Sequence, residues 1–243
     1  AHFIWNTYSV FMRLASLDRA TGCWLALVSD YPFIHGSVEI SYRPSLEGIP
    51  AWADECGVNQ VVLDVPIGLP TPGPKNSERP VDPEARKFIG VRRNSVFPCP
   101  PRPVLECATY EEARKLSMEI QGKGISQQSF AIFPGIREVD SWMTPELQSR
   151  FREMHPEVCF RGITGKIMAF HKSKSEGVEE RLQALRPFFV DLEKILASIP
   201  AAFIADALDA LVGLASLSRW INGQGESLGG QKDERGLRME MVY

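Results

Sequence analysis

One segment near the C-terminal end restricts the fold more than any other. Residues 201–217 are almost uniformly apolar, and Asp206 and Asp209 are their only charged side chains. A helix that is apolar nearly all round is buried, so the segment predicts a core helix over 201–222. The spacing of i, i+3 puts both carboxylates on one face of this helix. Small residues such as Gly213 continue that face and would let it approach a sheet closely.

Two carboxylates on a buried helix need compensation. Removing unpaired carboxylates from water carries a large free-energy cost, so the pair requires a cation or a shared proton. The alternative is that Asp206 and Asp209 are solvated near the start of the helix, where negative charge suits the helix dipole. The apolar residues around both carboxylates disfavour that alternative.

The rest of the chain has the pattern of a mixed α/β protein. Apolar or alternating runs predict strands at 12–18, 23–30, 37–42, 58–66, 152–160 and 237–243. Other patterns predict helices at 45–57, 109–121, 128–143 and 176–197. Three meandering strands followed by strands that alternate with helices indicate a mixed sheet with helices on its faces. The Pro- and Gly-rich segment 67–104 predicts irregular structure.

Two further acids stand at the ends of predicted strands. Asp18 ends the first strand and Asp64 ends the fourth. Those strands would be neighbours in such a sheet, so the two carboxylates are expected to lie side by side. The alternative is that each is a turn residue, which Asp18 fits better than Asp64, because Val-Pro-Ile follows Asp64.

Carboxylates from strand ends and one helix, without a His or Cys cluster, form a hard oxygen site. Such a site suits Mg²⁺ or Mn²⁺ rather than zinc. Two ions of this kind can clamp a phosphodiester while water displaces one of its oxygens.

A second acidic group consists of Glu153, His155 and Glu157. On a strand their side chains would face the same way. A glutamate of this group would then add a metal ligand, and His155 would shuttle a proton. Pro156 makes that common orientation uncertain, and the alternative is a polar residue with a structural hydrogen bond.

Charge is distributed unevenly along the chain. The net charge of -3 argues against a protein that coats nucleic acid non-specifically. However, segment 79–102 carries a net +4 and segment 161–186 a net +3. These stretches suit a polyanion held near carboxylates, although ordinary solvated surface is the alternative. The candidate phosphate contacts are Arg79, Arg92, Arg93, Arg102, Lys172 and Lys174.

The cysteines and the N-terminus bear on the cellular location. The five cysteines show no C-x-x-C spacing, which favours free thiols in a reducing cytoplasm. We expect no apolar run to approach the roughly 20 residues that span a bilayer, so no membrane association is predicted. Residues 1–11 lack the basic region and cleavage site of a signal peptide, and they are predicted to be an N-terminal extension.

The chain resembles the domain-of-unknown-function family 429, described as predicted nucleases of the RNase H-like superfamily. The resemblance covers about residues 12–243 and rests on the order and spacing of LASLDRATGCW, LDVPIGLP, ERPVDPEARKFIGVRRNSVFPCPPRP, ISQQSFAIFPGIREVD, EMHPEVCF, HKSKSEGVEERL, DALDALVGL and GLRMEMVY. It implies an RNase H-like α/β fold, in which a five-stranded mixed sheet is flanked by helices. The domain would span 12–222 with an insertion at about 67–150, and a tail at 223–243 would hold a terminal strand.

The resemblance also implies the site. In the superfamily, acids on the first strand, the fourth strand and the last helix bind two Mg²⁺ or Mn²⁺ ions. Those roles fall here on Asp18, Asp64, Asp206 and Asp209. The sequence departs from the pattern in two respects: the fourth-strand acid is often Glu, and the insertion has no counterpart in the minimal fold.

The expected function is therefore a divalent-metal-dependent nuclease that hydrolyses phosphodiester bonds. One alternative is a non-catalytic module that binds nucleic acid or a phosphorylated ligand. A second is an ATP-using phosphotransferase, which the single set of acids and the lack of a G-x-x-x-x-G-K-[ST] motif disfavour.

Overall fold

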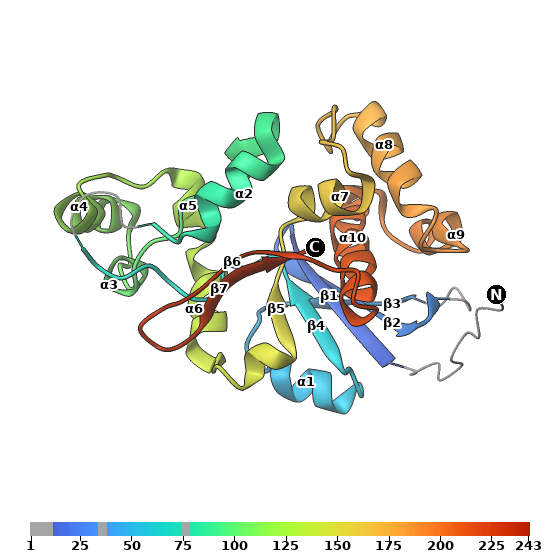
Figure 1. Ribbon diagram of the computed structural model, residues 1–243, viewed down its shortest axis with the longest axis horizontal. Coiled ribbons are helices and arrows are strands. Elements are labelled where there is room, and N and C mark those ends of the chain that lie inside the picture. Colours follow the sequence, from blue (N-terminus) through green and yellow to red (C-terminus); the bar gives the residue numbers. More distant parts are fainter. Residues whose placement is uncertain (1–11, 34–37, 74–77) are drawn as a thin grey trace, which may run out of the picture.

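The computed structural model contains one mixed sheet with helices packed on both of its faces (Figure 1). It describes residues 12–33, 38–73 and 78–243, so the predicted extension at 1–11 lies outside the described residues. The strands are β1 Met12–Ala20, β2 Cys23–Tyr31, β3 Val38–Arg43, β4 Gln60–Leu63, β5 Phe151–Glu153, β6 Ser227–Lys232 and β7 Arg238–Val242.

The strands are arranged in the order β3-β2-β1-β4-β5-β7-β6. β1 pairs antiparallel with β2 and parallel with β4, and the parallel pairing continues through β5 to β7. The mixed α/β class is therefore confirmed. Across the described residues the sheet has seven strands rather than the five expected. The additional strand β6 was not predicted, because its sequence SLGGQK is polar and Gly-rich, with low strand propensity.

The helices lie in the segments between these strands. They are α1 Ile49–Glu55, α2 Val81–Ile89, α3 Arg102–Leu105, α4 Tyr110–Gln121, α5 Gln127–Ala131, α6 Phe133–Trp142, α7 Pro156–Thr164, α8 Ser175–Leu185, α9 Leu192–Ala197 and α10 Ile204–Ile221. The predicted helix at 109–121 is confirmed, and it begins with the expected capping box of Thr109 and Glu112.

Four predicted elements differ from the structure. The single helix predicted over 128–143 is divided at Ile132 into α5 and α6. Helices α8 and α9 replace the single helix predicted over 176–197. Pro187, which has no backbone N–H to continue the helical hydrogen bonds, follows α8. The segment 67–104 is not wholly irregular, because it contains α2 and a 3₁₀ helix, η2, at Gly90–Ser95. Figure 1 shows α2 to α5 gathered on one side of the molecule and α8 and α9 on the other.

The strand predicted at 152–160 is wrong. β5 ends at Glu153, and α7 begins at Pro156. Proline is favoured at the first position of a helix, since its fixed φ suits the helix and its missing N–H would have no intrahelical partner there. Glu157 therefore lies in the first turn of a helix, where negative charge is favourable, and not on a strand.

The two faces of the sheet are covered by different helices. Leu14 of β1 and Val62 of β4 belong to the core that contains the buried face of α10, whereas Leu17 and Leu63 belong to the core beneath α1 and α6. Because side chains alternate along a strand, Asp18 falls on the α10 face of the sheet.

Helix α10 is the buried helix that the sequence predicted. The segment Ala201–Ile221 is long and apolar enough to cross a membrane, which corrects the expectation that no segment approaches that length. However, 67% of it is buried inside the protein, where it packs against β1, β2 and β4. These are the properties of a core helix.

Helix α10 approaches β1 closely at Gly213. A Cβ atom at this position would overlap the Ser16 hydroxyl, and it would also crowd the Met154 side chain. We expect Gly213→Ala to lower the free energy of unfolding by about 1–3 kcal/mol, as overpacking does. Helix propensity alone predicts the opposite, a gain of about 1 kcal/mol. Denaturant unfolding measures the change.

Gly124→Ala is the matched control, because a Cβ there meets only ordinary contacts with the flexible Arg114 side chain. Equal unfolding free energies for the two variants would contradict the close approach.

Candidate active site

Asp18 and Asp64 lie side by side where the pairing of the parallel strands β1 and β4 ends. Asp64 directly follows β4, whereas β1 continues to Ala20 and does not end at Asp18 as predicted. Leu17 pairs with Leu63, and the backbone N–H of Asp64 donates to the Leu17 carbonyl over 3.0 Å. The Asp64 carboxyl group is close enough to Asp18 to contribute to the rise in the pKa of Asp18. The predicted juxtaposition of these strand-end acids is confirmed.

Asp18 is unfavourably placed for a negative charge. Only 2% of its surface is exposed. Burial raises its pKa well above the ordinary value, repulsion from Asp64 and Asp209 adds to this, and Lys172 offsets part of the effect.

Asp206 and Asp209 extend from α10 and share the ammonium group of Lys172. The Lys172 Nζ lies 2.7 Å from Asp209 Oδ2 and 3.2 Å from Asp206 Oδ1. Burial raises the pKa of Asp209 to about 6, although Lys172 lowers it. Burial also lowers the pKa of Lys172, but the charges of Asp209 and Asp18 outweigh that effect and raise it overall.

We call Asp18, Asp64, Asp206 and Asp209 the acid cluster. Its four carboxyl groups come from β1, from the residue after β4 and from α10, and Lys172 is the cation that faces them. Lys172 was predicted to contact phosphate, yet here it neutralises the acids of the helix. In the described parts of the chain, no three His, Cys, Asp or Glu side chains are arranged so that they could hold a metal ion.

The second acidic group does not act as one unit. Glu153 is 3% exposed and accepts hydrogen bonds from Arg79 at 2.5 Å and from the Ile67 N–H at 2.7 Å. Burial raises the pKa of Glu153 to about 7, and Arg79 opposes that rise. Glu157 instead pairs with Arg181 at 2.5 Å.

The predicted common face of Glu153, His155 and Glu157 is therefore wrong, because the strand ends before His155. His155 is the residue that precedes the first turn of α7. Its Nε2 lies 3.2 Å from the Ser95 carbonyl oxygen, and its buried Nδ1 has no partner among the described residues.

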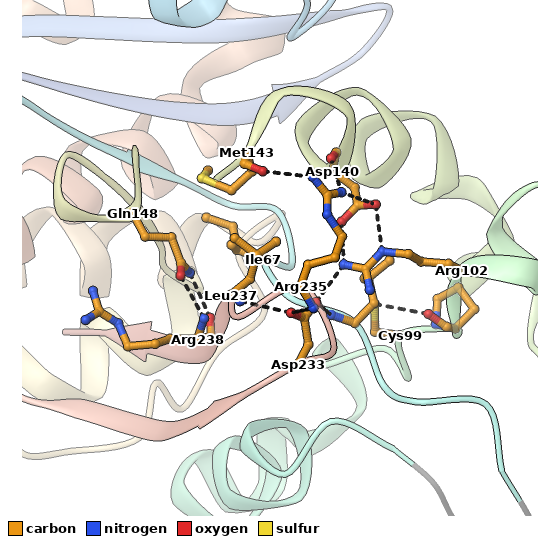
Figure 2. A network of polar contacts seen from close by, with 12 residues as sticks. Ile67, Cys99, Arg102, Asp140, Met143, Gln148, Asp233, Arg235, Leu237 and Arg238 are labelled. Atoms are coloured by element: carbon orange, nitrogen blue, oxygen red, sulfur yellow. Dashed lines mark hydrogen bonds and ion pairs between the residues drawn. The ribbon is translucent and has the colours of Figure 1, made fainter. Parts of the chain in front are cut away.

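Two of the six candidate phosphate contacts have structural roles instead. Arg79 is 0% exposed and cannot reach a polyanion. Arg102 makes a bidentate contact with Asp140 at 2.8 and 2.9 Å, and it bonds Asp233 at 2.6 Å. Figure 2 shows this network, in which Asp233 also accepts from the backbone of the chain near Leu237. Both arginines tie the insertion to the sheet.

An open space of about 540 Å³, here called the outer cleft, adjoins the acid cluster. It is lined by Asp64, Val91, Arg92, Asn94, Ser95, Phe97, His155, Pro156, Glu157, His171, Lys172 and Asp209. Arg92 donates to the Met168 carbonyl at 2.8 Å while it borders this cleft. Arg93 and Lys174 are exposed on the surface and do not line the cleft.

Sequence reasoning missed His171. Its imidazole is exposed, contacts the Ser173 hydroxyl at 2.8 Å and lines the outer cleft beside Lys172. The segment HKSKS contains a signal for the position of His171 in the cleft, since this residue directly precedes Lys172, which the sequence analysis assigned to phosphate binding.

Comparison with protein families gives one match. The family model described as "Protein of unknown function (DUF429)" matches residues 17–234. No curated protein and no solved structure matches the chain.

Lys172→Met tests whether the acid cluster depends on its counter-charge. Without metal, we expect the variant to be less stable at pH 8 by about 1–2 kcal/mol, below the ~3–5 kcal/mol of a fully buried pair, because the Lys172 side chain is 38% exposed. The raised pKa of Asp209 means that the folded state binds more protons between pH 3.8 and about 6, so stability falls as pH rises through that range. The pKa of Asp209 should rise further in the variant, so the loss should be small at pH 4.

Denaturant unfolding at both pH values in the presence of a chelator measures this difference. Lys174→Met is the matched control, because Lys174 is exposed and has no ion pair among the described residues. A loss that is equal at pH 4 and pH 8 would contradict the electrostatic role.

Proposed function

The chain belongs to the DUF429 family. From the geometry of the acid cluster, we propose that the protein is a divalent-metal-dependent hydrolase of phosphodiester bonds in nucleic acid. The observation that carries this proposal is the convergence of Asp18, Asp64 and Asp209 from three separate elements. Such convergence of mutually repelling buried carboxyls is common at functional sites and needs a compensating cation.

The order of the first five strands supports the RNase H-like fold that the proposal assumes. Three antiparallel strands in the order β3-β2-β1 continue into the parallel strands β4 and β5. The acids lie on β1, directly after β4 and on the last helix, which is the arrangement implied by the resemblance to the superfamily.

The residues of the acid cluster fit Mg²⁺ or Mn²⁺. Their donors are all carboxylate oxygens, which these hard cations prefer. Lys172 is the one cation that contacts these acids in the described chain, so the cluster retains excess negative charge when its acids ionise. The side chains described here are not arranged around a metal ion, so binding would require the carboxyl groups to turn toward it. Asp18, Asp64 and Asp209 would then hold the ion, with Asp206 beside them. A bound metal ion would supply an activated water and neutralise charge on the phosphate.

The protein's own groups would then bind and orient the substrate. Arg92 at the outer cleft and Lys174 on the adjacent surface offer positive charge to the phosphate backbone. His171 is exposed to solvent in the same cleft, which suits a group that transfers a proton to a leaving oxygen. His155, previously assigned that role, is held by the Ser95 carbonyl.

A non-catalytic binding module remains the alternative function. The outer cleft with Arg92, His171 and Lys172 would serve a phosphorylated ligand equally well. The acid cluster favours the enzyme, because carboxylates repel a phosphate unless a metal ion stands between them. Calorimetric titration with Mn²⁺ separates the two: absent binding, or binding that Asp209→Asn leaves unchanged, would favour the binding module.

Hydrolysis of a nucleic-acid panel tests the proposed activity. We expect the wild-type protein with Mn²⁺ to cleave at least one of single-stranded, duplex, hybrid and branched substrates. Asp18→Asn should lower that rate by about 10²-fold or more, the scale of removing one strong electrostatic contribution. Asp30→Asn is the control, because this exposed aspartate is paired with Arg13 at the opposite end of β1. Equal rates for wild type and Asp18→Asn across the panel would contradict the proposal.

A further inference from the structure

A second space lies directly behind the acid cluster. This inner pocket has a volume of about 120 Å³ and shares Asp64, Ser95, Phe97 and His155 with the outer cleft. Asp64, an acid of the proposed active site, therefore borders both spaces. A ligand that enters both would place one part beside the acid cluster and another part in the inner pocket.

The walls of the inner pocket are mostly apolar. They are formed by Trp24, Val65, Val96, Phe97, Ile132 and Met154, among others. Trp24 is held in place because Gly135 of α6 packs against its ring, where a Cβ atom would overlap it. The guanidinium of Arg19 lies 5.7 Å from the centre of the same ring. Such a pocket suits a flat ring with polar edges.

The volume limits the ring size. A cavity of about 150 Å³ accommodates a single benzene ring. The inner pocket, at about 120 Å³, is smaller, so it admits at most one six-membered ring, whose outer edge would extend toward the outer cleft. A pyrimidine base has one ring, whereas a purine has two fused rings and would not fit without movement of the walls.

One wall offers an unused hydrogen-bond acceptor. The Nε2 of His155 faces the Ser95 carbonyl at 3.2 Å. A carbonyl oxygen can only accept, so this Nε2 carries the hydrogen, and the Nδ1 of the neutral ring is an acceptor. That Nδ1 is buried and has no partner within the described chain. His155 lines the inner pocket, so a base that enters it and turns the His155 ring toward itself would satisfy this Nδ1 with a donor such as uracil N3–H or the cytosine amino group.

We propose that the inner pocket binds a single pyrimidine base, so that the attached phosphodiester lies at the acid cluster. This inference deepens the proposed phosphodiester hydrolase and rests on it. It also gives the insertion a role, since Ser95, Val96 and Phe97 belong to the segment that the minimal fold lacks.

Binding of free nucleosides tests the pocket without any catalytic step. Uridine, adenosine and ribose are titrated into the metal-free protein, and Trp24→Phe identifies the fluorescence signal of Trp24. We expect saturable quenching by uridine, at least about fivefold weaker binding of adenosine, and no saturable effect of ribose. Equal binding of uridine and adenosine, or no binding of uridine, would overturn the proposal.

Two variants examine the size argument. Val96→Phe fills the inner pocket and should abolish uridine binding, whereas the same change at Val190, which is 72% exposed and outside the pocket, should not. Phe97→Ala enlarges the pocket and should bring adenosine binding close to that of uridine. If Val96→Phe fails to fold, as judged by its thermal unfolding, the Phe97→Ala ratio decides alone. An unchanged ratio in a folded Phe97→Ala variant would overturn the proposal.

The results distinguish this inference from the proposed function. Uridine binding together with no cleavage of any nucleic acid would leave the pocket in place and reject the hydrolase. Cleavage without base preference, combined with no uridine binding, would reject the pocket and retain the hydrolase.

Discussion

The contact between the Lys172 ammonium and the carboxylates of α10 is the interaction on which the proposed active site depends. Helix α10 can pack its apolar side chains against β1 only if a cation balances the negative charge of Asp209 where this residue lies near Asp18. The loop before α8 places Lys172 there: Glu180 accepts from the Ala169 and Phe170 backbone at 2.8 and 3.1 Å. The same loop passes so close to α8 that Gly177 cannot carry a Cβ beneath the His171 carbonyl.

A second set of charges, buried on the opposite side of the site, fixes the insertion. Arg79 has no exposed surface and lies between Glu153 at the end of β5 and Asp82 on α2, at 2.5 and 3.7 Å. Removing one partner of such a pair would leave a buried charge uncompensated, which costs more than the pair itself contributes. Arg102 joins the same insertion to Asp233 near the last hairpin (Figure 2). Arg79 and Arg102 precede and follow Val96 in the chain, so their contacts anchor both sides of the segment that lines the inner pocket.

Features that depend on the local sequence pattern, such as a buried helix, were predicted from the sequence. Features that depend on the interaction partner of a side chain, such as the burial of an arginine, were missed. The long apolar run of α10 and the strand-end positions of Asp18 and Asp64 were sufficient to predict a carboxyl cluster, because burial and topology follow from periodicity. A count of basic residues along 79–102 could not reveal that Arg79 is buried against Glu153. The turn from β5 into α7 was missed because an alternating run outweighed the one strong helix-start signal, Pro156.

The inner pocket restricts the form in which a polymer could reach the acid cluster. A base within a duplex is stacked and paired, so it can enter a single-ring pocket only after it is extruded, at a cost of a few kcal/mol. An unpaired base needs only to unstack, and base–aromatic contacts of about 1–3 kcal/mol with residues such as Trp24 and Phe97 can repay that cost. The narrowness of a pocket of about 120 Å³ beside Asp64 therefore favours single-stranded nucleic acid, or the frayed end of a duplex. Arg92 then needs to bind only the phosphates next to one base. A chain with a net charge of -3 can supply that much positive charge at one place on its surface.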